Sequence, residues 1–322
     1  MIGHDPRRLR AGVDIGGTKT LGVLLDESGE VLVSRRTASG FGAAEVVRSA
    51  ETVLAELAAE VGADAGALAS IGIGIPGAVD AETGTVRQAL NLGIERVELG
   101  AALRDRLGRA VHVENDVNAA AVGAAHGDVR SLAYLNLGTG LAAGLVLDGR
   151  LWRGARGAAG EIGHVPIDPT GPQCTCGQRG CLEVMASGSG IQRQWGAEPA
   201  PDAEGVLALA AAGDERASAI VERLVWAVAS AVRLLVLADD VERVAIGGGL
   251  AGGFGAALTG AVDARLREWE AASPFLASLA PADRVVAVPR DRPIAAIGAA
   301  LAAAPTEGGV LGGVVGAEVG HG

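Results

Sequence analysis

The chain has little cysteine, and all of it lies in one short segment. The three cysteines among 322 residues are Cys174, Cys176 and Cys181. An odd number of cysteines, two of them separated by a single residue, does not fit a disulfide framework. Reduced thiols that suit a metal ion are typical of the cytoplasm, where we expect this protein to be located.

Basic residues are scarce relative to acidic ones. The chain has 27 Lys and Arg against 38 Asp and Glu, a formal net charge of −11. Proteins that bind nucleic acids gain their affinity from Lys and Arg side chains that neutralise phosphates. The charge balance therefore argues against a nucleic-acid partner, and we interpret the locally basic segment 5–10 as a solvated leader.

No segment has the pattern of a membrane span or of a secretory signal. The uncharged stretch 131–147 is interrupted by Asn136 and by the turn Gly138-Thr139-Gly140. The opening residues, MIGHDPRRLRAGVDIGG, lack the apolar core of a signal peptide. We therefore expect no membrane partner.

The cysteines share a turn-rich loop, residues 163–183, with a histidine. His164, Cys174, Cys176 and Cys181 together supply one imidazole and three thiolates, a donor set that Zn²⁺ prefers. Four protein ligands leave no position for water or substrate, which predicts a structural zinc ion. A catalytic zinc ion with one ligand displaced, and free thiols beside an unrelated histidine, are the alternatives.

Two segments have the same strand, glycine turn and strand layout. RAGVDIGGTKTLGVLL begins at Arg10 and LAYLNLGTGLAAGLVL at residue 132, and one offset aligns Gly16 with Gly138 (138 − 16 = 122). The same offset aligns Asp14 with Asn136. The repetition predicts a duplicated domain in which a glycine turn from each half faces a shared cleft.

Two nucleotide-binding motifs are excluded by their context. Residues 72–77 spell G-x-G-x-x-G, but Pro76 and the alternation of apolar residues indicate a strand with no helix after it. Lys19 lacks the glycine spacing of a Walker A motif. Phosphate binding is therefore expected at the two repeated turns, where backbone N–H groups can approach phosphate oxygens and Asp14 can hold Mg²⁺ through water.

Polar side chains also cluster at the strand-to-helix junction ENDVNAAA. One interpretation is helix capping, for which Asp and Asn are well suited. The other makes Asp116 a general base toward a substrate hydroxyl, with Asn115 binding a neighbouring hydroxyl. The residues alone favour neither. Glu161 and Glu183, at the edges of the zinc loop, are either bidentate partners for sugar hydroxyls or surface charges.

The sequence as a whole resembles the glucokinase branch of the ROK family of repressors, open reading frames and sugar kinases. The resemblance covers residues 11 to about 303 and rests on VDIGGTKT, GIPGAVD, VENDVNAAAVG, LNLGTG, RGARGAAGEIGH, CTCGQRGCLE and AIGGGL, in family order. It implies an α/β fold of the actin-like, hexokinase-like (ribonuclease H-like) type, with two duplicated domains, a cleft between them and a zinc-binding loop.

The resemblance also implies a function and a set of site residues. The implied reaction is transfer of the γ-phosphoryl group of ATP to the primary hydroxyl of a hexose such as glucose, with Mg²⁺ and a structural Zn²⁺, in a homodimer. The catalytic base would be Asp116, and the sugar would contact Gly77, Asn91, Asn115, Asp116, Glu161, His164 and Glu183. His164 would bind zinc through one ring nitrogen and the sugar through the other. The ATP site would comprise Asp14, Gly16, Gly17, Thr18, Lys19, Gly138, Thr139, Gly140, Gly248 and Gly249.

The sequence departs from the family pattern at three places. Ala142 and Ala143 replace glycines that usually extend the second turn, which alters nucleotide approach or stiffens the hairpin. Ile94 stands where glucokinases commonly have Trp, near the expected sugar site. The stretch VPRDRPIAAIG lacks the usual Leu-Gly-Asp-like approach to the last helix.

Periodicity and turn signals predict two domains. A small N-terminal domain is expected over residues 11–118, completed by a C-terminal helix over 292–304. A larger domain is expected over 119–291, followed by a Gly-rich tail over 305–322. Alternative substrates are an N-acylaminosugar and a C7 cyclitol. A sugar-sensing repressor is the rival function, disfavoured because the dozen residues before the first strand are too few for a helix-turn-helix domain.

Overall fold

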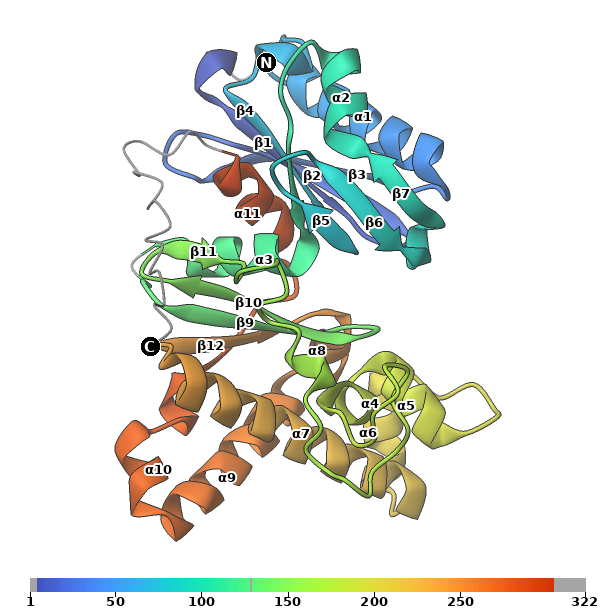
Figure 1. The fold of residues 1–322 in the computed structure, drawn as a ribbon, viewed down its shortest axis with the longest axis vertical. Coiled ribbons are helices and arrows are strands. Elements are labelled where there is room, and N and C mark those ends of the chain that lie inside the picture. Colours follow the sequence, from blue (N-terminus) through green and yellow to red (C-terminus); the bar gives the residue numbers. More distant parts are fainter. Residues whose placement is uncertain (1–4, 128, 304–322) are drawn as a thin grey trace, which may run out of the picture.

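Two five-stranded sheets form the two halves of the molecule (Figure 1). The computed structural model describes residues 5–127 and 129–303. The first sheet contains β1 (Arg10–Ile15), β2 (Lys19–Leu25), β3 (Val31–Ala38), β4 (Ser70–Ile75) and β8 (His112–Asn115). The second contains β9 (Leu132–Leu137), β10 (Leu141–Leu147), β11 (Arg150–Trp152), β12 (Arg243–Gly247) and β13 (Val285–Ala287).

The two sheets have the same topology. Their strand orders are β3-β2-β1-β4-β8 and β11-β10-β9-β12-β13. In each, an antiparallel hairpin is continued by strands parallel to its first strand. The 122-residue offset relates both ends of β1 to those of β9, and both ends of β2 to those of β10. The predicted duplicated α/β fold is therefore confirmed, and the glycines of the G-x-G-x-x-G pattern lie in and after β4, with strand β5 (Ala78–Asp80) next.

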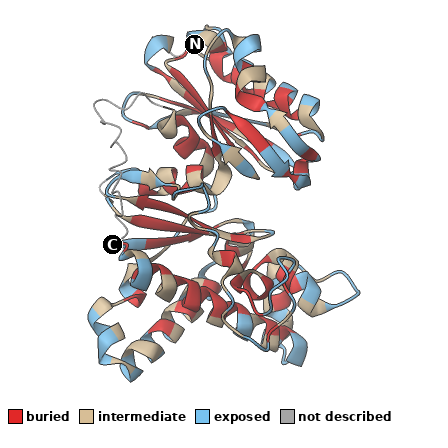
Figure 2. Ribbon diagram, viewed as in Figure 1, coloured by how far each residue is buried: buried red, intermediate tan, exposed pale blue. Residues whose placement is uncertain are grey.

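Helices and a small sheet surround the first sheet. Helix α1 (Ala43–Ala59) packs on β1, β2 and β3 through a face that is buried in Figure 2. Strands β5, β6 (Thr85–Ala89) and β7 (Ile94–Glu98) form a separate antiparallel sheet, followed by α2 (Leu99–Leu107). The short 3₁₀ helices of this half are η1 (Pro6–Arg8), η2 (Ala65–Ala67) and η3 (Leu90–Leu92).

The second half carries most of the helices. The longest, α7 (Glu215–Asp239), begins at the side-chain cap of Asp214 and buries one apolar face against α4, α6 and α9. The other elements are η4 (Ile162–His164), α4 (Leu182–Ala186), α5 (Gly188–Trp195), α6 (Ala203–Ala211), α8 (Gly249–Phe254), α9 (Ala256–Ala272), α10 (Pro274–Leu279) and η5 (Ala282–Arg284). No helix in residues 5–127 and 129–303 combines the length and hydrophobicity of a membrane span.

Two helices cross between the halves. Helix α3 (Asp116–Ala125) follows β8 of the first sheet but packs on β9 and β10 of the second. Helix α11 (Ile294–Ala302), where a helix was expected over 292–304, follows β13 but packs on β1 and β4. The Gly-rich tail expected at 305–322 lies outside the described residues.

Glycines allow the two crossing helices to approach each other and the first sheet. A Cβ atom at Gly298 would lie 1.7 Å from the Ala119 carbonyl oxygen, and one at Gly123 would lie 2.0 Å from that of Ile294. A Cβ atom at Gly12, on β1, would lie 1.9 Å from the Ala296 carbonyl oxygen of α11. Because backbone atoms fill the space of each missing side chain, larger residues would push the halves apart. The close contact between α3 and α11 therefore connects the second sheet, on which α3 packs, to the first sheet, on which α11 packs.

Candidate active site and metal site

A cavity of about 350 Å³ lies between the halves, at the ends of the central strands. Its walls include Asp14 from β1, Asp116 from the start of α3 and Asn136 from β9. The loop that begins α8 contributes Gly248 and Gly249. Four of the residues expected at the nucleotide and catalytic sites are thus brought together from segments more than 200 residues apart.

The two carboxyl groups of the cavity are poorly solvated. Burial, together with the negative charge of Asp116, raises the pKa of Asp14 to about 7. Burial also raises the pKa of Asp116, although the backbone N–H of Val117 donates to its Oδ1 at 3.0 Å and opposes the shift. Tyr134 lines the same cavity and donates to Asn136 Oδ1 at 3.2 Å. Within the described residues, no cationic side chain forms an ion pair with either aspartate, so the cavity can accept a cation.

The raised pKa of Asp14 predicts a pH-dependent change in stability. A carboxyl whose pKa is higher in the folded state stabilises that state below pH 4, and this contribution is lost as the pH rises through 7. Asp14→Asn should therefore gain free energy of unfolding relative to the parent as the pH rises from 4 to 8. One pKa unit corresponds to about 1.4 kcal/mol, so the gain is at most about 4 kcal/mol.

Urea unfolding at pH 4, 6 and 8 in magnesium-free buffer measures this difference. The exposed Asp64 provides the matched control, Asp64→Asn, which also removes one carboxylate. A stability difference between Asp14→Asn and the parent that is constant across the pH range would contradict the expected titration.

The two interpretations of ENDVNAAA apply to different residues. Asn115 is the cap of α3, because its Oδ1 accepts from the N–H groups of Val117 and Asn118 at 2.9 and 3.1 Å. Its Nδ2 donates to the Gly77 carbonyl oxygen at 3.1 Å. Asp116, the first helical residue, is left free of capping and faces the cavity. Capping by Asn115 therefore directs the Asp116 carboxyl toward the space where a ligand would bind.

Glu114 supports this junction from the buried side. Its Oε1 accepts from the backbone N–H of Asn115 at 3.0 Å and from Asn118 Nδ2 at 3.1 Å. Arg153, from the second half, donates through Nε to Glu114 Oε2 at 2.9 Å. Burial would raise the pKa of Glu114, but His112 Nε2, 3.7 Å from Glu114 Oε2, and the hydrogen-bonded guanidinium of Arg153 outweigh it and lower the pKa to about 2. This ion pair therefore stays charged and joins the halves beside Asp116.

The first glycine turn, between β1 and β2, is closed by a hydrogen bond from Gly16 N to the Lys19 carbonyl oxygen at 2.9 Å. Ser39 also holds this turn. Its hydroxyl donates to the Gly16 carbonyl oxygen at 2.6 Å, and its backbone N–H donates to the Thr18 carbonyl oxygen. Asn91, expected at the sugar site, lies beside this turn, since a Cβ at Gly17 would be 3.3 Å from its Nδ2.

The second glycine turn, between β9 and β10, is held by residues after the zinc loop. Gly138 N donates to the Gly140 carbonyl oxygen at 3.0 Å, and Gly188 N donates to that of Gly138 at 2.8 Å. Glu183 Oε2 accepts from Leu141 N at 3.2 Å and occupies the place that a side chain at Gly140 would take. Glu183 thus connects the zinc loop to the turn expected to bind phosphate.

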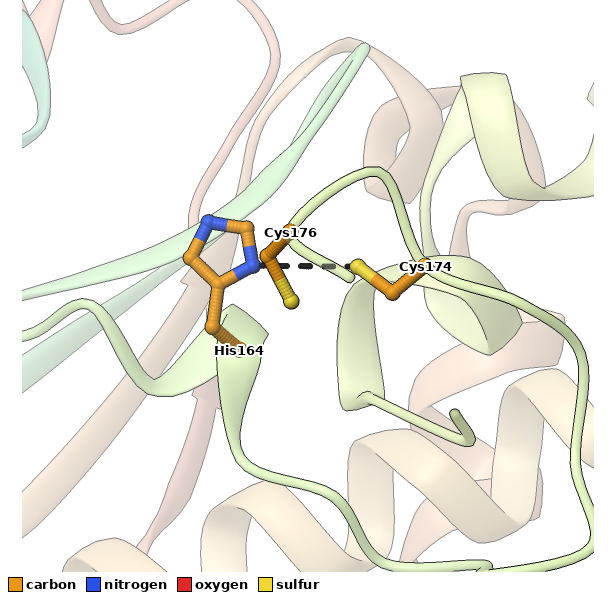
Figure 3. A group of neighbouring side chains, drawn as sticks. All are labelled: His164, Cys174 and Cys176. Atoms are coloured by element: carbon orange, nitrogen blue, oxygen red, sulfur yellow. Dashed lines mark hydrogen bonds between the residues drawn. The ribbon is translucent and has the colours of Figure 1, made fainter. Parts of the chain in front are cut away.

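The histidine and cysteines of the loop converge. His164 Nδ1 lies 3.9 Å from Cys174 Sγ, and the donor atoms of His164, Cys174 and Cys176 all lie within 4.8 Å of one another. Figure 3 shows Nδ1 directed toward the thiols, with the other ring nitrogen pointing away from them. Cys181 Sγ lies 3.7 Å from Cys176 Sγ.

These distances fit a zinc ion. Two sulfurs at about 2.3 Å from a tetrahedral zinc ion are separated by about 3.8 Å. The separation of 3.7 Å between Cys176 and Cys181 matches this value. The hydrogen bond from Gln178 Nε2 to Cys176 Sγ, at 3.4 Å, suits a thiolate. The structure thus groups His164, Cys174 and Cys176 as three possible zinc ligands, while Cys181, the fourth expected ligand, lies at the edge of this group beside Cys176 and directs its thiol to the His164 carbonyl oxygen at 3.5 Å.

The remaining expected residues lie at the edges of these groups. Glu161 is exposed and starts η4, and Gly77 has a φ of 105° that favours glycine. Ile94 is 2% exposed and belongs to the N-terminal core, so it does not face the cleft. Ala142 and Ala143 belong to β10, where Ala142 pairs with Asn136 and Ala143 N donates to the Gly160 carbonyl oxygen at 2.8 Å. Those two alanines therefore reinforce the strand beyond the turn.

Sequence reasoning missed several residues of the site. Asn136 was aligned with Asp14 by the repeat offset, a signal that could have identified it. Nothing local marked the Glu114–Arg153 pair, because its members are 39 residues apart. Arg290 and Arg292, which also line the cavity, lie in the stretch where the sequence departs from the family pattern.

Comparisons with known proteins place the chain among sugar kinases and their relatives. A model described as "ROK family" matches residues 10–301. A glucokinase from Thermotoga maritima is 37% identical over 270 residues, which are 76% of this chain and 83% of the glucokinase. An N-acetylmannosamine kinase from Citrobacter koseri is 36% identical over 257 residues, 75% of this chain and 84% of that kinase.

A solved structure shares the fold along almost the whole chain. It is the crystal structure of a glucokinase from Streptomyces griseus in complex with glucose and AMPPNP. The TM-score is 0.70 at 27% sequence identity, covering 92% of this chain and 99% of that one. Because the match includes both halves, the relative and this chain share the arrangement of two sheets and crossing helices.

Proposed function

The chain belongs to the ROK family, and from this premise we propose that it is an ATP- and Mg²⁺-dependent kinase that phosphorylates the primary hydroxyl of a hexose. Glucose is the proposed acceptor. The observation that carries the proposal is the cavity in which Asp14 and Asp116 meet, at the strand ends from which both glycine turns begin. A relative with this fold binds glucose and AMPPNP, which supports the same pair of ligands here.

Asp116 is the proposed general base. Its carboxyl accepts the proton of the sugar hydroxyl as the oxygen attacks the γ-phosphorus, the bond from that phosphorus to the β-bridging oxygen breaks, and ADP leaves. In a loose phosphoryl-transfer transition state the proton moves late, so a carboxylate is basic enough. The raised pKa of Asp116 favours proton acceptance. The cap at Asn115 keeps the carboxyl directed into the cavity.

Asp14 and the glycine turns are the proposed donor site. Asp14 would hold Mg²⁺ through water, and the ion would offset negative charge on the phosphates when bound. Backbone N–H groups of Gly17, Thr18 and Thr139 would approach the phosphate oxygens. The links from Ser39 and Glu183 hold both turns in place before the nucleotide binds.

The zinc loop is proposed to hold the sugar. His164 turns Nδ1 toward the thiols, so that zinc bound there would leave the protonated Nε2 for a sugar hydroxyl. Zinc in this position would supply structural rigidity and leave no open site for chemistry. The carboxylates of Glu161 and Glu183 are proposed to accept hydrogen bonds from sugar hydroxyls. Glu183 already accepts from Leu141 N at the second glycine turn.

The test is a panel of acceptors with MgATP, in which ADP release is coupled to detection of the phosphorylated product by mass spectrometry. Glucose should give the highest kcat/KM. N-acetylmannosamine is the second candidate because a 36% identical relative carries that activity in its name; mannose, fructose, N-acetylglucosamine and C7 cyclitols complete the panel. Sugar binding in calorimetry without turnover of any acceptor would refute the kinase and favour a sugar sensor.

A further inference from the structure

The loop between β13 and α11, residues 288–293, brings two arginines to the cavity that holds Asp14 and Asp116. Arg290 and Arg292 both line it, whereas Asp291 between them does not. This loop is part of VPRDRPIAAIG, where the sequence departs from the pattern it otherwise follows. The loop therefore adds two positive charges to the cavity wall.

Hydrogen bonds hold the backbone of this loop in place. Val288 N donates to the Ile246 carbonyl oxygen at 2.9 Å, which continues the pairing of β12 and β13. Arg292 N donates to the Pro289 carbonyl oxygen at 3.2 Å and closes a turn, with Pro293 directly after it. Proline at both ends of the turn restricts the backbone, so little backbone conformational entropy is lost when the arginines bind a ligand.

The position of the loop relates it to the donor site. Strand β13 is two strands away from β9 in the second sheet, so the loop begins roughly 10 Å from Asn136. The start of α8 lies between them, and the side chain of Arg290 runs over Gly252, where a Cβ atom would lie 3.0 Å from the arginine Nε. The side chain of Arg290 is therefore displaced from the carboxylates, along the wall that contains Gly248 and Gly249.

Both guanidinium groups are available to a ligand. Arg290 lies 4.0 Å from Glu204, but these side chains are 67% and 75% exposed, and such a pair is screened by water. Arg292 has no ion pair within residues 5–127 and 129–303. A cavity with carboxylates at one position and two arginines farther along, one of them only in a water-exposed pair with Glu204, suits an anion whose near end carries a metal ion.

We propose that Arg290 and Arg292 bind the phosphoanhydride chain of the phosphoryl donor, on the side away from the transferred group. The inference rests on the kinase activity proposed above. With the γ-phosphoryl group beside Asp116, the rest of the chain extends toward α8, where guanidinium groups can donate bidentate hydrogen bonds to phosphate oxygens. Nucleotide triphosphates and inorganic tripolyphosphate share this chemistry, and the experiment separates them.

The variants are Arg290→Ala, Arg292→Ala and the double variant, with Arg193→Ala as the matched control. Arg193 is an exposed arginine on α5, outside the residues that line the cavity. The double variant should raise KM for MgATP roughly 10-fold or more, because each arginine makes charge-assisted hydrogen bonds. KM for the sugar and the melting temperature should stay within twofold and 2 °C or so of the parent. Its KM for MgATP should also depend less on salt than that of the parent.

Tripolyphosphate, added as a competitor of MgATP, identifies which part of the donor is bound. The parent should be inhibited competitively, and the double variant should need roughly 10-fold more tripolyphosphate for the same inhibition. Loss of MgATP affinity with unchanged inhibition by tripolyphosphate would assign the arginines to the nucleoside and overturn the proposal. Unchanged KM for MgATP in an active double variant would also overturn it.

Failure of the proposed function gives a different result. If the parent transfers no phosphoryl group, calorimetry with the nonhydrolysable analogue AMPPNP and Mg²⁺ replaces the kinetic measurement. Weaker binding to the double variant than to Arg193→Ala supports the arginine site even when the kinase assignment is wrong. Equal binding to the parent and the double variant refutes it.

Discussion

Asp116→Asn should lower kcat roughly 10³-fold while the dissociation constant of the sugar changes less than threefold. Asparagine keeps the size of the side chain and can still accept a hydrogen bond from Val117 N, as Asp116 does at 3.0 Å. It lacks a group that can take the proton from the attacking hydroxyl. The effect should therefore fall on kcat and leave ground-state binding in place.

The measurement is steady-state kinetics of product formation combined with calorimetry of sugar binding. Asp105→Asn, at an exposed position on α2, is the control for removal of one carboxylate. The Asn variant also lacks the Asp116 carboxyl, so any pH dependence that its residual activity keeps would come from another group of the cavity, such as Asp14. Turnover within tenfold of the parent would show that another group accepts the proton.

Cys176→Ser should remove most of the zinc and weaken the sugar site. Structural zinc ions contribute about 10 kcal/mol or more in small zinc domains, and a serine hydroxyl is a poor ligand in place of a thiolate. We expect the zinc content to fall well below one ion per chain and KM for the sugar to rise roughly 10-fold or more, because His164 and Glu183 lose their fixed positions. Since Cys176 is exposed, its replacement leaves the core intact.

Metal content by plasma mass spectrometry, thermal unfolding and sugar kinetics measure these effects together. Thr175→Ala is the matched control, an exposed position between two of the cysteines. It should keep zinc, stability and KM. A parent purified without chelator that contains no zinc, or a Cys176→Ser variant that retains a full equivalent, would contradict the assignment of the loop.

The zinc loop could be predicted from sequence because its donors lie close together in the chain. Twenty residues rich in glycine and proline include the histidine and every cysteine, and no other set of soft donors competes for a metal. Which ring nitrogen of His164 faces the thiols was not encoded locally. That orientation follows from η4 and from its packing against α4, which places Nδ1 on the thiol side.

The strand-to-helix junction shows where local reasoning reaches its limit. Asp and Asn are equally suited to capping and to catalysis, so the residues of ENDVNAAA left both open. The fold assigned the capping to Asn115, one residue before the helix, and placed Asp116 within its first turn, where it lines the cavity. Burial then raises the pKa of both aspartates, and the charge of Asp116 adds to the shift of Asp14; both effects depend on tertiary contacts.

The sequence by itself determined the features that repeat or lie close together in the chain. The 122-residue offset specified both hairpins to the residue, since alternation and glycine turns are local signals. The sequence predicted that the C-terminal helix returns to the first domain, but only the tertiary structure decided how closely α11 approaches α3 and β1, which depends on glycines nearly 300 residues apart, such as Gly12 and Gly298. The same long-range packing brought Asp14, Asp116, Arg290 and Arg292 to one cavity. A cavity is bounded by surfaces from distant segments, so no local pattern describes its walls.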